Sequence, residues 1–308
     1  MPVQGPIHVD RPLTNISIAY KAEGLIADEV FTVVPVKKES DSYFIFDKAQ
    51  SLKSVATLRA DGAEANQDNL LLSTATYRLQ EHALKEIITQ RQRENADEGL
   101  NLDVATTEDL TAKVLLQKEV DAATLLFTDG GWANESSLSA ALAWSANTTV
   151  SNPILTADSA ASTVLLNAAR PANTCVLDYR TFLAVKEHTS VVDRIKYTSS
   201  ESVGPDLIAK LFGVEKLHVA KGQRNTAEEG LAATMANIFT DSAWFGYVEK
   251  SPGLRKPSAL YCFKRGSGVT AKRWMDEPRN GEWIEVSHMY DQVVPASDAG
   301  YLVVNTVQ

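Results

Sequence analysis

One long amphipathic segment constrains the fold more than any other feature of the sequence. From Leu110 to Phe127, apolar residues recur at three- and four-residue steps, which is the period of a helix with one buried face. Thr106-Thr107 and the two acids that follow supply an N-cap, and Asp129-Gly130-Gly131 ends the run. We therefore expect a spine helix over 107–128, about 30 Å long.

The first forty residues show no sustained helical period. Pro2, Pro6, Pro12 and Pro35 interrupt short apolar runs. This pattern predicts an extended arm with one short helical piece near Asn15 to Tyr20.

Two β-prone runs enclose a polar stretch after the arm. The runs are Ser42 to Asp47 and Leu70 to Leu79, and the polar residues between them are 48–69. Tyr77 and Leu79 alternate with polar neighbours and so share one face. We expect a long hairpin with a polar distal end, whose exposed edges invite pairing with another chain.

The second half of the chain has a different pattern. Beyond Ser151, helical and strand-like segments alternate with short turns, and from Leu260 onward the pattern is almost wholly β. We expect helices over Asp158–Ala169, Tyr179–His188 and Ser202–Phe212, and strands over Cys175–Leu177, Leu217–Ala220, Trp244–Val248, Leu260–Lys264, Gly281–Tyr290 and Gly300–Val307. The fold class is therefore α+β.

Charge and hydropathy argue against a nucleic-acid binder, a secreted protein and a membrane protein. The chain of 308 residues has 30 Lys and Arg against 39 Asp and Glu, a formal net charge of −9, so its surface repels phosphate backbones. The start of the chain lacks the basic and apolar regions of a secretory signal. Ser136 to Ala157 is uncharged, but polar residues fall in every turn, which excludes a membrane span.

No catalytic motif is recognisable. The chain has neither Gly-x-x-x-x-Gly-Lys-Ser/Thr nor Gly-x-Ser-x-Gly, and we interpret Gly266-Ser267-Gly268 as a turn between β segments. The five histidines are scattered without a His-x-x-x-His pair, so we expect no zinc site and no cofactor.

The remaining candidates for chemistry are weak. Cys175 and the distant His188 could act as nucleophile and base only if the thiol ionised, but its apolar strand would desolvate it and keep it neutral. Adjacent carboxylates such as Glu228-Glu229 are typical of solvated faces, and Lys272-Arg273-Trp274 is typical of a solvated rim beside an anchoring Trp. A chain with an arm, a long hairpin and a rod-like helix, but no convergent site, favours a structural role.

Several segments, in order, resemble the major capsid proteins of tailed bacteriophages. The resemblance covers nearly the whole chain and consists of packing and turn patterns rather than catalytic signatures. The segments are Leu13–Tyr20, Ile26–Asp41, Ser151–Ile154, Val191–Tyr197, Leu207–Val214 and Asp298–Val303.

The resemblance implies the Hong Kong 97 type phage capsid fold. By position, it divides the chain into an N-terminal arm (1–41), an E-loop hairpin (42–75), a P-domain with the spine helix (76–149), a mixed α/β A-domain (150–258) and a β-rich return through the P-domain (259–308), whose last strand can rejoin the A-domain. If assembly needs a scaffold, we expect it to be a separate chain, because no long helical segment is seen before the arm and Met1 argues against cleavage from a longer product.

The function that the resemblance implies is structural, not enzymatic. It is self-assembly into the icosahedral head that encloses the genome of a tailed phage or prophage, as part of the virion, with assembly in the bacterial cytoplasm. The implied partners are many copies of the chain in hexamers and pentamers, then scaffolding, portal and decoration proteins. Packaged DNA would be met only through non-specific contact, and no membrane is involved.

Arms and loops that reach across neighbours supply contact area without a large rigid patch.

Some members of the family that the chain resembles join their subunits by a Lys-to-Asn isopeptide bond. Lys48 and Lys53 lie in the expected hairpin, but we do not favour this cross-link because Lys is common in solvated loops. The candidate inter-subunit contacts are Ile16, Tyr20, Phe31, Tyr43, Phe44, Phe46, Lys48, Lys53 and Arg59.

Two alternatives remain open from the residues. An encapsulin-like compartment has the same fold and would co-purify with a cargo enzyme. A soluble α/β hydrolase or transferase would be a compact monomer or dimer with a deep pocket near Cys175.

Overall fold

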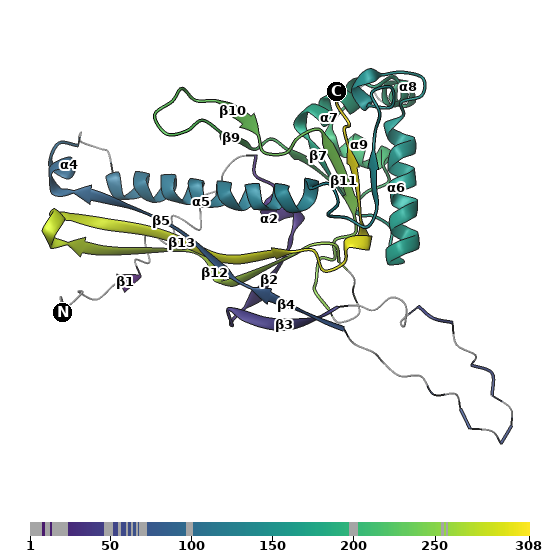
Figure 1. The fold of residues 1–308 in the computed structure, drawn as a ribbon, viewed down its shortest axis with the longest axis horizontal. Helices are drawn as coiled ribbons and strands as arrows, with labels where there is room; N and C mark the ends of the chain where they lie inside the picture. Colours follow the sequence, from purple (N-terminus) through teal and green to yellow (C-terminus); the bar gives the residue numbers. More distant parts are fainter. Residues whose placement is uncertain are drawn as a thin grey trace.

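A long β-sheet and the helix that lies along it form the elongated part of the molecule (Figure 1). Strands β12 (Tyr261–Asp276) and β13 (Gly281–Val293) form an antiparallel pair, and β5 (Gln80–Thr89) pairs with the other edge of β13. Helix α5 (Leu102–Phe127) packs on β13 and β5. This unit corresponds to the P-domain, with α5 as its spine helix.

The computed structural model describes residues 8–9, 13, 24–45, 52–54, 57–59, 61–62, 64–65, 67, 73–96, 101–196, 203–253, 256 and 258–308. The expected helical piece near Asn15 to Tyr20 lies outside these residues.

Helix α5 begins earlier than expected. The side chain of Asn101, not Thr106 or Thr107, is the N-cap, because its oxygen accepts a hydrogen bond from the amide of Val104. The Thr107 hydroxyl donates instead to the carbonyl of Asp103 one turn back, at 2.7 Å. Since a threonine can satisfy its hydroxyl inside a helix in this way, the expected start at 107 was wrong.

The apolar face of α5 covers the sheet. Leu110 and Val114 pack with Ile284 and Val286 of β13, in a buried cluster that also includes Leu13 from the arm. The expected helical periodicity is confirmed here, because residues four apart on α5 meet alternate residues of one strand.

Two arm segments complete the open edge of β12. Strand β2 (Thr32–Val36) pairs parallel with its first half, and β1 (His8–Val9) pairs antiparallel near Arg273. Between these partners, β12 shifts its register from Lys264 to Val269. Gly266 and Gly268, with φ of +60° and +105°, supply the left-handed backbone for this β-bulge. The expected turn at 266–268 is therefore a bulge within one strand.

A second sheet forms the A-domain. Its strand order is β6-β14-β11-β7-β8, with β11 antiparallel to both β14 and β7. The strands are β6 (Glu135–Ser137), β14 (Gly300–Val304), β11 (Ser242–Gly246), β7 (Thr174–Asp178) and β8 (Lys216–Ala220).

The last strand, β14, lies in this sheet beside β11, and β6 pairs with it from the other side. The sheet therefore includes residues that precede position 150, where the sequence predicts that the A-domain starts. Glu135-Ser136-Ser137 has no β pattern of its own, so only long-range pairing makes it a strand.

Helices surround the A-domain sheet, whose strands β7 and β11 are completely buried. Asn152 caps the first of these helices and Pro153 occupies its first turn, so this helix begins before the expected Asp158. The helices are α6 (Pro153–Ala168), α7 (Tyr179–Glu187), α8 (Thr189–Ile195) and α9 (Pro205–Leu211).

Two separate hairpins project from these domains (Figure 1). One is formed by β3 (Ser40–Ile45) and β4 (Ser73–Arg78), the other by β9 (Gln223–Asn225) and β10 (Met235–Asn237). Short helical pieces are α2 (Ala27–Val30), α4 (Gln90–Glu94), η1 (Trp144–Ala146), η2 (Glu277–Arg279) and η3 (Ser297–Ala299). Within the described ranges, none of the helices has the length and apolar character needed to cross a bilayer.

Candidate assembly surfaces

Aromatic packing fixes the base of the β3–β4 hairpin to the P-domain. Phe263 of β12 stacks on Tyr77 of β4, with ring centroids 4.5 Å apart, and contacts Tyr43 of β3 at 5.1 Å. Tyr77 and Leu79 are both buried in this cluster, which confirms their predicted common face. Because strand side chains alternate, the neighbouring Phe44 points away and is exposed.

The segment between β3 and β4 carries apolar side chains that its own subunit leaves in solvent. Leu52 is exposed, and Leu58 is 94% exposed. Lys53 and Arg59 are exposed beside these leucines. Asp61 and Glu64 are also exposed in this segment, so the hairpin presents apolar residues among charges of both signs, on the side of the molecule away from α5 (Figure 1).

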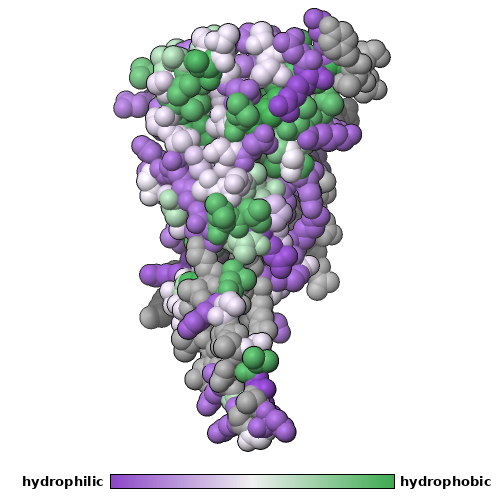
Figure 2. Space-filling view, turned by 90° about the vertical axis from the view of Figure 1, so that its right-hand side faces the viewer, coloured by the Kyte–Doolittle hydropathy of each residue, from purple (hydrophilic) through white to green (hydrophobic). Residues whose placement is uncertain are grey.

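The outer surface of the A-domain is also apolar. Figure 2 views this side of the molecule and shows hydrophobic residues gathered over its upper part. Leu166 of α6 is 82% exposed, and Leu155 lies on the same face of the helix, three turns away. The large exposed apolar residues of the A-domain helices and of the segment before α6 are Leu142, Val150, Leu155, Leu165, Leu166, Tyr179, Leu183 and Val192.

Helix α2 ties the arm to both domains. Both carboxylate oxygens of the buried Glu119 accept hydrogen bonds, from the amides of Ile26 and Ala27 at 2.9 and 2.8 Å. Burial raises the pKa of Glu119, and the two amides offset part of that rise. Lys118 of α5 pairs with Asp28, and Glu29 lies 3.3 Å from Nδ1 of His218 on β8.

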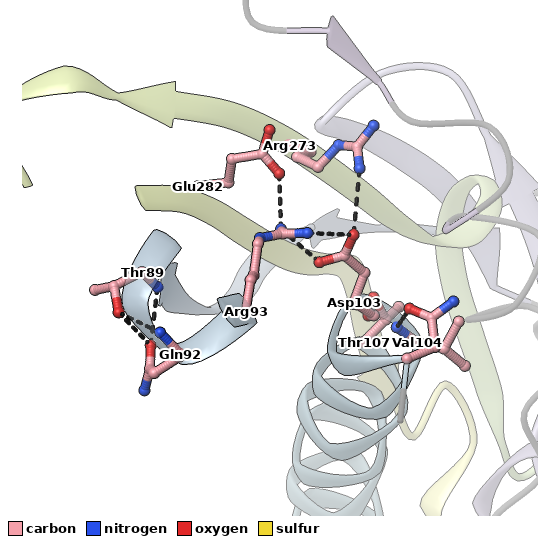
Figure 3. A network of polar contacts seen from close by, with 9 residues as sticks. Thr89, Gln92, Arg93, Asp103, Val104, Thr107, Arg273 and Glu282 are labelled. Atoms are coloured by element: carbon pink, nitrogen blue, oxygen red, sulfur yellow. Dashed lines mark hydrogen bonds and ion pairs between the residues drawn. The ribbon is translucent and has the colours of Figure 1, made fainter. Parts of the chain in front are cut away.

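An arginine network fastens the start of α5 to the sheet (Figure 3). Both terminal nitrogens of Arg93 donate to the Asp103 carboxylate, at 2.6 and 3.2 Å, and one also donates to Glu282 of β13 at 2.8 Å. Arg273 of β12 approaches the same Asp103 at 3.5 Å. The acid also sits in the first helical turn, where it complements the helix dipole.

The structure corrects one candidate contact. Phe31 is 2% exposed and packs in the core shared with α5 and the A-domain, so it is not a surface residue. Its position directly after α2 turns it inward. Tyr43 anchors the hairpin, whereas Phe44, Lys53 and Arg59 are exposed.

Ile16, Tyr20, Phe46 and Lys48 lie outside the described residues. The described parts of the arm contact their own subunit, since β1 pairs with β12 and Leu13 is buried under α5. The open edge of β12 offers these parts hydrogen bonds within the same chain. That the arm also reaches a neighbour stays a prediction.

The enzyme alternative fails at its proposed nucleophile. Cys175 is fully buried in β7, and burial raises the pKa of its thiol well above the ordinary value. His188 instead caps α8 and contacts the hydroxyls of Ser190 and Ser151. Among the residues that the structure describes, no three His, Cys, Asp or Glu side chains are grouped to hold a metal ion.

Sequence reasoning missed the exposed leucines of α6. Leu155 and Leu166 have the same helical spacing as core leucines, so the pattern predicts burial. The only available signal is that α6 has apolar residues on more than one face, while Ala157, Ala160 and Val164 already fill the buried one.

Comparisons with known proteins agree with this architecture. No family model matches the chain. A curated relative, the major capsid protein of Pseudomonas phage JBD67, is 27% identical over 98% of each chain.

Solved structures share the fold. A phage-related protein from Bordetella bronchiseptica superposes with a TM-score of 0.77 at 20% identity, over 98% of this chain and 99% of the other. The capsid of the cyanophage P-SCSP1u superposes with a TM-score of 0.60 at 12% identity, over 93% and 89%.

The fold is thus the Hong Kong 97 type capsid fold, with the E-loop hairpin at β3–β4, the P-domain around α5, and the A-domain around β11. The resemblance to the major capsid proteins of tailed phages, stated from the sequence, is confirmed by the curated relative.

Proposed function

We propose that this chain is a major capsid protein that self-assembles into the icosahedral head of a tailed bacteriophage or prophage. The role is structural rather than enzymatic. The curated relative that matches nearly the whole chain bears the name of such a protein, which favours a phage head over a cargo-holding compartment.

The observation that carries the proposal is the exposure of large apolar side chains at two separate places, Leu166 on the A-domain and Leu58 beyond β3. Clusters of large exposed apolar side chains are more typical of interaction sites than of a monomer's exterior. Identical copies arranged head to tail bring different surfaces of the same chain together and close into rings.

The finer features of the shell belong to the same proposal. Rings of five and six copies would place the A-domain surface and the E-loop hairpin against neighbours, during assembly in the host cytoplasm. Scaffolding, portal and decoration proteins would be further partners, and the net charge of −9 would keep packaged DNA from adhering to the inner wall.

Substitutions on α6 test the role of the apolar surface. We expect Leu155→Asp with Leu166→Asp to leave a folded monomer and to abolish fast-sedimenting particles in sedimentation velocity, because a charge replaces apolar contact area on one helix face. The matched control, Leu155→Met with Leu166→Met, keeps that area and should assemble. Particles formed as well by the aspartate variant as by the wild type would contradict the proposal.

A further inference from the structure

We draw no further inference here: the strongest candidate, the polar groove of about 870 Å³ between α2, α9 and β8, is lined by side chains of both charges, and nothing in the described part of the chain shows what covers it.

Discussion

The Nζ atom of Lys118 lies 2.5 Å from Oδ1 of Asp28, although the lysine side chain is 2% exposed and the aspartate 59%. The pair joins α5 to α2, where the arm enters the molecule. Burial alone would raise the pKa of Asp28, but Lys118 lowers it below the ordinary value. The buried Lys118 therefore needs Asp28 to balance its charge, whereas the exposed Asp28 is also stabilised by solvent.

Removal of the Asp28 charge alone should lower stability more than removal of both charges of the pair. We expect Asp28→Asn to lower the free energy of unfolding by about 1–2 kcal/mol, less than a fully buried pair would lose, because solvent screens Asp28. Adding Lys118→Met should recover part of this loss, since no unpaired buried charge then remains. Urea unfolding of the unassembled chain, followed by circular dichroism, measures both. A double variant less stable than Asp28→Asn would contradict this account.

Acid should destabilise the P-domain through His288. This residue lies on β13 beneath α5, is 3% exposed, and neither ring nitrogen has a hydrogen-bond partner in the described structure. Burial, and then the nearby charge of Lys118, lower the pKa of His288 to about 3. Asp28 acts in the opposite direction, and Lys264 and His82 in the same direction as Lys118.

Because the folded-state pKa is below the unfolded value of about 6.5, the unfolded chain takes up the proton first. Stability should therefore fall as pH drops below about 6.5, with a contribution from His288 of up to about 1.4 kcal/mol per pH unit. His288→Leu should remove this contribution from urea unfolding between pH 7 and 5, whereas His82→Leu should retain it. Identical pH dependence in wild type and His288→Leu would refute the assignment.

Loss of the Arg93 network should loosen the start of α5. Arg93→Ala removes the donors to Asp103 and Glu282, and we expect amide hydrogen exchange in the first turns of the helix to rise by about three- to tenfold. Arg279→Ala, which breaks an exposed pair with Asp276, should change exchange there little. Unchanged exchange over 102–110 in Arg93→Ala would show that the network does not hold the helix.

Much of the fold could be predicted because local patterns and tertiary contacts agree. The apolar spacing of α5 and the shared face of Tyr77 and Leu79 follow from side-chain periodicity, and the buried strand around Cys175 follows from a short apolar run. The start of α5 could not be predicted in this way. Thr106 and Thr107 are good capping residues by type, but Asn101, five residues before Thr106, is the actual N-cap.

The assembly surfaces were harder to predict. Whether Leu166 is buried depends on which faces of α6 the A-domain sheet covers. Whether Gly266-Ser267-Gly268 forms a turn or a bulge depends on the pairing of β12 with β13. The β9–β10 hairpin was missed because Gln223-Arg224-Asn225 has no β pattern, so its turn and the side chain of Asn225 define it instead.

Electron microscopy of the full chain after expression in bacteria, alone and together with a phage scaffolding protein, tests the shell role most directly. We expect closed, hollow particles of uniform size, with rings of five and six copies in their walls. A correctly folded chain that remains monomeric at every concentration and in both expressions would contradict the account.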